Sequence, residues 1–293
     1  MRLWEIWWNL VSCLRPAFAR TRTFLWFSAA MAGVCIRPDL AGVTSIVRAL
    51  GLEEMYYDRL LDMFHSKAIN LEKLTRLWTG LVLRTLNSHL LRVRGRVVLL
   101  ADGIKVAKSG RKMPAVKKLQ QESDNNSKSE YIFGHSCQAI AVAASAGIST
   151  FAVPLACRIH EGVVFSNRDK RTLLDKMIQL LFSLDVNCPA ILVADAYYAS
   201  AKIIKPMLKS GQHLVSAVRS NAVAYFPADP PKTKGRGRPR KYGDKVKLKA
   251  LFDDDTEFVE AKSPLYGERN VTLRYRAVDL LWRPIGVQVR FVL

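Results

Sequence analysis

Arg96-Val-Val-Leu-Leu-Ala-Asp102 and Ala190-Ile-Leu-Val-Ala-Asp195 are the two stretches that decide the predicted fold. Each is a short apolar run that ends on an aspartate, a pattern typical of a strand buried on both faces. In open α/β sheets the carboxyl ends of such strands face the crevice where ligands bind. We therefore expect each aspartate to stand at the exit of its strand, on one shared rim of a sheet.

The charge of the chain indicates a polyanionic partner. Among 293 residues, 45 Lys and Arg face 25 Asp and Glu, which gives a net charge of +20. Such an excess favours nucleic acid, because each neutralised phosphate releases counterions. An anionic membrane surface and a merely basic soluble protein are the alternatives.

Two carboxylates on a basic chain predict divalent-metal chemistry on nucleic-acid phosphate. Mg²⁺ and Mn²⁺ prefer hard oxygen ligands, and two such ions ~4 Å apart can hold both the attacking and the leaving oxygen of a phosphoryl displacement. The simpler interpretation of a strand-end aspartate is a turn or a helix cap, and Asp195 directly precedes a predicted helix. The spacing alone leaves both interpretations open.

Residues 1–91 show helical periodicity, and we expect an all-α, DNA-binding N-terminal domain there. Trp4, Trp7 and Trp8 recur at helical spacing, and we expect them to pack a core. Val43–Phe64 resembles a helix-turn-helix, which would place Arg59 on the exposed side of its second helix. Any two packed helices give the same pattern, so DNA reading by this pair is one of two interpretations.

Residues 92–220 alternate strands with helices, which predicts a mixed α/β sheet with flanking helices. A polar, basic segment from Lys108 to Lys128 lacks periodicity and is expected to be a loop. The expected strands are Val97–Ala101, a hairpin of Cys137–Ala144 with Ser149–Arg158, Ile191–Ala194 and His213–Val218; the expected helices are Lys170–Leu184 and Ala199–Lys209.

Residues 221–293 form the third predicted domain, a basic linker followed by a β-rich insertion. The linker contains Arg236-Gly-Arg-Pro239, which resembles the core of an AT-hook that enters the narrow minor groove of A·T tracts. A solvated linker that touches the DNA backbone without reading sequence is the alternative. The expected DNA-binding residues are Lys234, Arg236, Arg238, Arg240 and Lys241.

The sequence predicts a cytoplasmic chain that does not enter a membrane. Its five cysteines form no Cys-x-x-Cys pair, which is typical of thiols in a reducing compartment. Ala139–Cys157 is the one long uncharged stretch, but Pro154 and the Ala146-Gly147 break favour two strands joined by a turn.

Four motifs resemble the DDE transposases of bacterial insertion sequences. They are Leu100-Ala-Asp-Gly103, Pro154-Leu-Ala-Cys-Arg-Ile-His-Glu-Gly162, Leu192-Val-Ala-Asp-Ala-Tyr-Tyr198 and Arg236-Gly-Arg-Pro-Arg-Lys-Tyr-Gly243. The resemblance implies an RNase H-like fold, interrupted by a strand-rich insertion before the third acid. It implies that Asp102 and Asp195 bind two Mg²⁺ or Mn²⁺ ions. It also implies hydrolysis and strand transfer on double-stranded DNA, at element ends and target, with a homodimer on the DNA.

The chain departs from the family pattern at the third acid. That glutamate is expected in a Tyr-x-x-Arg-x-x-x-Glu-x-x-x-x-x-x-Lys arrangement, and Tyr266 and Arg269 match its first half, but position 273 is Leu. Glu257, Glu260 and Glu268 have no such context. We therefore expect the third acid beyond Leu293, an incomplete insertion, and an inactive, C-terminally truncated fragment that binds DNA without cutting it.

Three alternatives to a transposase follow from the same residues. Another RNase H-like nuclease would use the same two aspartates. A non-catalytic DNA-binding regulator would compete with intact transposase for element ends. A membrane protein would use Ala139–Cys157 and would need detergent for solubility.

Overall fold

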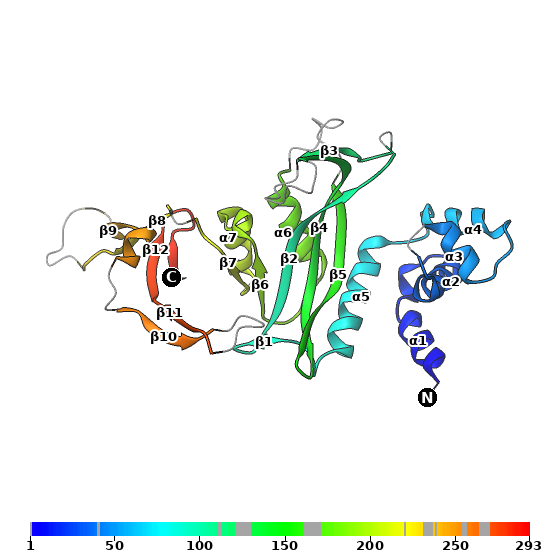
Figure 1. The fold of residues 1–293 in the computed structure, drawn as a ribbon, viewed down its shortest axis with the longest axis horizontal. Helices are drawn as coiled ribbons and strands as arrows, with labels where there is room; N and C mark the ends of the chain where they lie inside the picture. The colour runs from blue at the N-terminus through cyan, green and yellow to red at the C-terminus, as the bar shows by residue number, and fades with distance from the viewer. Residues whose placement is uncertain are drawn as a thin grey trace. The chain divides into compact units, whose positions relative to one another are not determined.

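The computed structural model describes residues 2–39, 42–110, 113–120, 130–160, 171–219, 221–230, 237, 239–253, 257–263 and 270–293 (Figure 1). The chain divides into two compact units. The first comprises Met1–Arg171 with Lys176–Ile191, and the second comprises Thr172–Asp175 with Leu192–Leu293.

The front of the first unit is helical, as its periodicity predicted. Its helices are α1 (Leu3–Ser12), η1 (Arg15–Ala17), α2 (Thr21–Ile36), α3 (Val43–Ala49), α4 (Tyr56–Phe64) and α5 (Leu71–Thr85). Asn70 caps α5, because its side chain accepts a 2.9 Å hydrogen bond from the Lys73 amide. The helix pair expected within Val43–Phe64 is confirmed, because α3 and α4 both lie in this range. Arg59 is exposed on α4.

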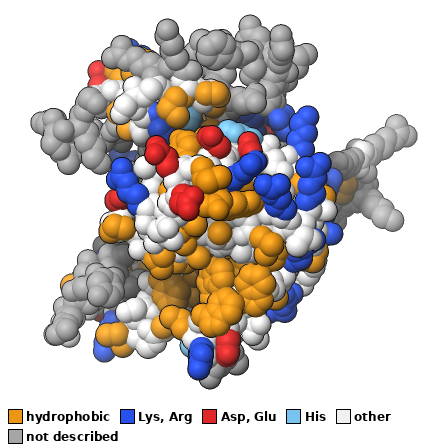
Figure 2. Space-filling model, turned by 90° about the vertical axis from the view of Figure 1, so that its right-hand side faces the viewer, with side chains coloured by type: hydrophobic (Ala, Val, Ile, Leu, Met, Phe, Trp, Pro, Cys, Tyr) orange, Lys and Arg blue, Asp and Glu red, His pale blue; other side chains and the backbone are white. Residues whose placement is uncertain are grey.

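The tryptophans of α1 only partly follow the expected core packing. Trp7 and Trp8 pack against a core cluster that includes Phe18 and Phe24. Trp4 is 60% exposed, so the prediction is wrong for this residue. Leu3 is 82% exposed beside it. Figure 2 shows hydrophobic side chains gathered on part of the face that carries the helical region.

The largest sheet confirms the predicted mixed α/β architecture with an RNase H-like strand order. Its strands follow the order β3-β4-β2-β6-β7, with β1 beside β2 and β5 beside β4. Strands β5, β4 and β2 form an antiparallel meander. Strands β6 and β7 extend the sheet beyond β2, so the order read from β5 is β5-β4-β2-β6-β7. The strands are β1 (Arg92–Val93), β2 (Arg96–Ala107), β3 (Lys117–Gln120), β4 (Tyr131–Ala146), β5 (Ser149–His160), β6 (Ala190–Ala194) and β7 (His213–Ser216).

The β4–β5 hairpin forms where the sequence predicted it, from a stretch that could have been mistaken for a membrane segment. Ala146 pairs with Ser149 at its tip, and Gly147 adopts φ +59° in the turn, a conformation that glycine adopts without a Cβ penalty. Helix α5 packs on β5, where the Trp78 indole donates a 2.9 Å hydrogen bond to the Pro154 carbonyl. Within the described residues, no helix is long and apolar enough to cross a bilayer.

Two predictions about the neighbourhood of Asp102 are wrong. β2 does not end at Asp102 but continues to Ala107, because the long β4 offers backbone partners as far as Gly134. The segment expected as a loop contains β3, which pairs with the start of β4. The side chains of β2 from Asp102 to Ala107 are exposed, so backbone pairing with β4 and not burial extends the strand.

Helix α6 (Leu173–Ser183) and helix α7 (Ala201–Lys209) confirm the two predicted helices, and the 3-10 turn η2 (Ala196–Tyr198) precedes α7. Met177 of α6 and Ile203 of α7 are fully buried. Ser200 caps α7, since its side chain accepts a hydrogen bond from the Lys202 amide.

The rest of the second unit is β-rich, as expected for an insertion. A four-stranded sheet has the order β13-β12-β8-β9, and a two-stranded sheet pairs β10 with β11. A core cluster under the larger sheet contains Leu248, Leu280 and Phe291. The elements are β8 (Val223–Pro227), β9 (Tyr242–Lys247), η3 (Leu248–Phe252), β10 (Val259–Lys262), β11 (Thr272–Tyr275), β12 (Ala277–Trp282) and β13 (Val287–Val292). The basic linker, predicted for residues 227–249, therefore contains a strand, β9, that the sequence did not indicate.

Candidate active site and nucleic-acid contacts

Asp102 lies within β2, on a face of the sheet defined by strand register. It pairs with Ala139 of β4, and Ala139 pairs with Cys157 of β5. Because paired residues of adjacent strands project to the same face, these three form one row across the sheet. Asp102 is exposed, and its Oδ1 accepts a 2.7 Å hydrogen bond from the Gly103 amide.

Asp195 directly follows β6 and caps η2. Its Oδ1 accepts a 3.1 Å hydrogen bond from the Tyr197 amide, and its backbone carbonyl accepts a 2.6 Å hydrogen bond from Ser216 Oγ. The capping interpretation considered for this residue is thus confirmed. Capping does not exclude metal binding, since an ionised carboxylate offers about four lone-pair positions on its two oxygens.

The two aspartates belong to different units, Asp102 to the first and Asp195 to the second. Both carboxylates are exposed, and each accepts a backbone hydrogen bond through Oδ1. Hard carboxylate oxygens that stay accessible fit Mg²⁺ or Mn²⁺. In the part of the chain that the structure describes, no group of three or more His, Cys, Asp or Glu side chains could hold a metal ion.

The glutamates considered for the third acid have structural surroundings or lie outside the described residues. Glu257 pairs with the buried guanidinium of Arg276, with 2.5 Å between Oε2 and Nη2. Arg276 is 7% exposed and also donates a 3.0 Å hydrogen bond to the Leu251 carbonyl, so Glu257 is the counterion of a buried cation. Glu260 lies exposed on β10, and Glu268 lies outside the described residues.

The structure describes only part of the basic segment around Arg236-Gly-Arg-Pro239. Lys234, Arg236 and Arg238 lie outside the described residues. Arg240 and Lys241 are exposed directly before β9. Arg240 Nε donates a 2.6 Å hydrogen bond to the Tyr242 carbonyl, and Lys241 Nζ donates to the Gly286 carbonyl. Both exposed side chains therefore donate to neutral backbone oxygens.

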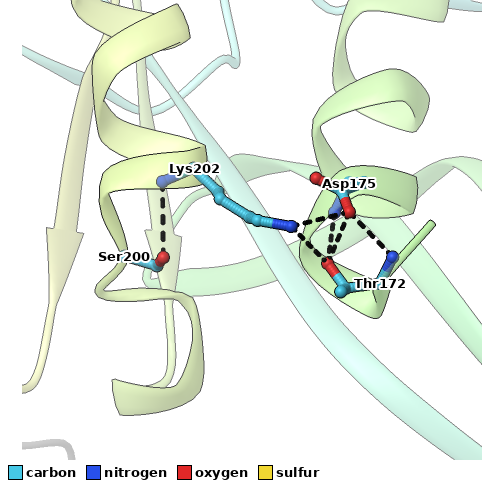
Figure 3. A network of polar contacts seen from close by, with 4 residues as sticks. All are labelled: Thr172, Asp175, Ser200 and Lys202. Atoms are coloured by element: carbon cyan, nitrogen blue, oxygen red, sulfur yellow. Dashed lines mark hydrogen bonds and ion pairs between the residues drawn. The ribbon is translucent and has the colours of Figure 1, made fainter. Parts of the chain in front are cut away.

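A polar network within the second unit was not predicted from the sequence (Figure 3). Thr172 and Asp175 form a reciprocal cap at the start of α6, in which Asp175 Oδ2 accepts 2.7 Å hydrogen bonds from the Thr172 amide and hydroxyl. Lys202 of α7 points to this cap, with Nζ 2.9 Å from Asp175 Oδ2. The hydrogen bonds from Thr172 and then Lys202 lower the pKa of Asp175 to about 2. The Thr172-x-x-Asp175 spacing is a capping-box signal that could have revealed the first half of this network.

Comparison with known proteins assigns the family. A family model described as DDE superfamily endonuclease matches residues 13–279, so the chain belongs to the DDE superfamily endonucleases. Among solved structures, the chain is similar to piggyBac transposase in a synaptic complex with hairpin DNA, at 15% identity and a TM-score of 0.31. That alignment covers 74% of this chain and 45% of the other, so this chain matches less than half of the transposase. No curated protein matches the chain.

Proposed function

We propose that this chain is the DNA-binding and metal-binding part of a DDE transposase of the insertion-sequence type. Asp102 and Asp195 are its first two metal-binding acids, and double-stranded DNA is its partner. The observation that carries the proposal is the family match over residues 13–279, which includes both aspartates. Two further observations support it: both carboxylates are exposed, and the chain carries a net charge of +20.

In this proposal each residue type has a defined task. The two aspartates hold Mg²⁺ or Mn²⁺, which when bound supplies the Lewis acidity that phosphodiester hydrolysis and strand transfer require. The backbone amides of Gly103 and Tyr197 orient the two carboxylates. Arg240 and Lys241 contact DNA phosphates, together with the cations of the basic segment. We further propose that the chain acts in the cytoplasm and that two copies meet on DNA.

The first test measures metal binding directly. We expect wild-type protein to bind Mn²⁺, detected by loss of the free-ion EPR signal, and expect Asp102→Asn and Asp195→Asn each to weaken binding by about tenfold or more. Asp244→Asn is the matched control, because Asp244 is also exposed, on β9, but has no proposed metal role. Equal Mn²⁺ binding by all four proteins would remove the two aspartates from the proposal.

The same variants also test catalysis. We propose that the chain binds DNA without cutting it, because two aspartates alone hold a second ion poorly and a misplacement of ~1 Å can cost ~100-fold in rate. A gel-shift assay and a nicking assay with Mg²⁺ on the same DNA separate binding from cleavage. A Mg²⁺-dependent nick that disappears in Asp102→Asn would contradict the proposed inactivity and would support the catalytic assignment.

A non-catalytic regulator of transposition is the second candidate function. The use of Glu257 as the counterion of Arg276 favours it, because this glutamate is then committed to the structure of the second unit. Such a regulator would bind element ends and would reduce the activity of an intact transposase added to the same reaction. A chain that binds DNA but leaves that activity unchanged would exclude this role.

A further inference from the structure

A polar cavity in the first unit lies outside the two aspartates and the basic segment. It has a volume of about 410 Å³ and opens between α5, β5 and α6. Three cationic side chains and one carboxylate contribute to its walls, beside a buried histidine and an amide. These lining residues are Arg158, Arg171, Lys176, Glu72, His160 and Gln179.

Arg158, which lines the cavity, lies on the sheet face opposite Asp102. Arg158 pairs with Gln138, and Gln138 pairs with Gly103, so these three form the row next to that of Asp102. Since successive residues of a strand project to opposite faces, Arg158 and Asp102 lie on opposite faces of the same sheet. A ligand of this cavity is therefore separate from a metal held by Asp102.

Arg158 is oriented by neutral partners. Its Nη2 donates a 2.8 Å hydrogen bond to Thr75 Oγ1, and its Nη1 donates a 3.1 Å hydrogen bond to the Cys157 carbonyl. Thr75 is itself fixed, because it is 5% exposed and donates to the Leu71 carbonyl. Among the described residues no carboxylate forms an ion pair with Arg158, so the guanidinium is positioned while its charge is retained.

Among the described residues that line the cavity, Arg171 and Lys176 add two cations to Arg158, beside one carboxylate, Glu72. Arg171 Nη1 donates a 2.9 Å hydrogen bond to Gln179 Oε1, which holds a second guanidinium with a neutral amide. Burial, and then repulsion by Lys176, lowers the pKa of Lys117 on the neighbouring β3. A bound anion would relieve this repulsion, and a guanidinium held in a fixed orientation suits the paired oxygens of a phosphate group.

We propose that a backbone phosphate of double-stranded DNA occupies the cavity, bound by Arg158, Arg171 and Lys176. The choice of DNA as the source of the phosphate rests on the proposed function. The site then anchors the duplex on the sheet face opposite Asp102, as a contact that carries no sequence information.

The test measures the salt dependence of DNA binding by the full chain. Fluorescence anisotropy of a labelled duplex is recorded in EDTA for wild type, Arg158→Gln, Lys176→Gln and the double variant. We expect each substitution to reduce the slope of log K against log salt by ~0.9, and the double variant to bind about tenfold or more weakly at low salt. Arg84→Gln is the matched control, because Arg84 is an exposed cation on α5 outside the cavity, and we expect less than about a twofold change.

The outcomes separate this inference from the proposed function. If the Arg158 and Lys176 variants bind DNA as tightly as Arg84→Gln does, and wild type binds well, the inference about the cavity is wrong while the proposed function stands. A wild-type chain with no DNA affinity would overturn both. If inorganic phosphate raises the Tm of wild type but not of Lys176→Gln while DNA binding is unchanged, the ligand is a free phosphate and the assignment to DNA is wrong.

Folding is controlled within the same series. Arg158→Gln also removes the hydrogen bond that links β5 to Thr75, so its Tm is compared with that of wild type. Lys176→Gln leaves that link intact, so a loss of affinity in this variant with an unchanged Tm supports the proposal independently.

Discussion

Asp175 is a residue through which pH acts on the stability of the second unit. Its folded pKa of about 2 lies below the ordinary value of 3.8, so its contribution is fully present above that ordinary value and is lost as pH falls toward about 2. We expect Asp175→Asn to lower the Tm near neutral pH, because the Lys202 ion pair is lost. The difference from wild type should stay constant down to about pH 4 and narrow as pH falls from about 4 toward about 2.

The control for this titration is Asp244→Asn, at an exposed aspartate on β9. We expect its Tm to follow that of wild type at each pH. A difference between wild type and Asp175→Asn that stays constant across the acid range would mean that the carboxylate of Asp175 does not titrate as its hydrogen bonds imply.

The sequence was sufficient to single out the two aspartates but not to give their local roles. Asp195 stands at a strand exit as predicted, because a short buried strand and a following cap are both local signals. Asp102 does not, because β2 continues along a partner that lies far away in the sequence. The cavity at Arg158 and Lys176 was missed, since its walls come from three separate elements and share no motif.

Two helical glycines allow a test of element packing with one type of substitution. Gly33 of α2 is buried, and an added Cβ would lie 2.6 Å from Ile46 Cγ2 and 3.2 Å from Leu50 Cδ1 of the adjoining α3 segment. Ile46 is 3% exposed and β-branched, so it cannot move aside easily. We expect Gly33→Ala to destabilise the protein by ~1–3 kcal/mol, measured by urea denaturation.

Gly80 of α5 is the matched control for this prediction. There an added Cβ would meet only Arg84 Nη1, at 3.4 Å, which is the end of a flexible side chain. Alanine is the better helix former, so we expect Gly80→Ala to stabilise by ~0.5–1 kcal/mol. If Gly33→Ala were as stable as Gly80→Ala, the close contact between α2 and α3 would not limit packing.

Elements with strong periodicity were predicted well, and those that depend on distant partners were not. Helices α6 and α7 lie within a few residues of their expected ranges, and the β4–β5 turn lies where it was expected, because apolar spacing and turn residues are local. β4 itself begins at Tyr131, six residues before the expected start. β9 was missed inside the basic linker, because the polar and apolar residues of Tyr242–Lys247 alternate only weakly. Its partner strand β8 lies on the other side of the basic linker in the sequence. β3 was missed for the same reason, since its pairing with β4 is its main support.

On the scale of the whole molecule, charge connects the family assignment to the proposed partner. The excess of 45 cationic over 25 acidic side chains is spread over both units, and exposed cations such as Arg59 and Arg240 accompany the cavity at Arg158. A distribution of this kind favours contact with phosphates over recognition of bases. Affinity for DNA should therefore depend strongly on ionic strength and weakly on sequence.

This expectation leads to a prediction for the intact chain. If six or more phosphates are contacted, affinity for a random-sequence duplex should fall by about 10³-fold between ~50 and ~200 mM salt, because bound phosphates release their counterions. Anisotropy titrations over this range measure the slope, and the same duplex with uncharged methylphosphonate linkages is the control. We expect the control duplex to bind weakly at every salt concentration. A shallow slope with strong preference for one sequence would instead indicate that base contacts dominate, and Arg59 on α4 would then be the first residue to substitute.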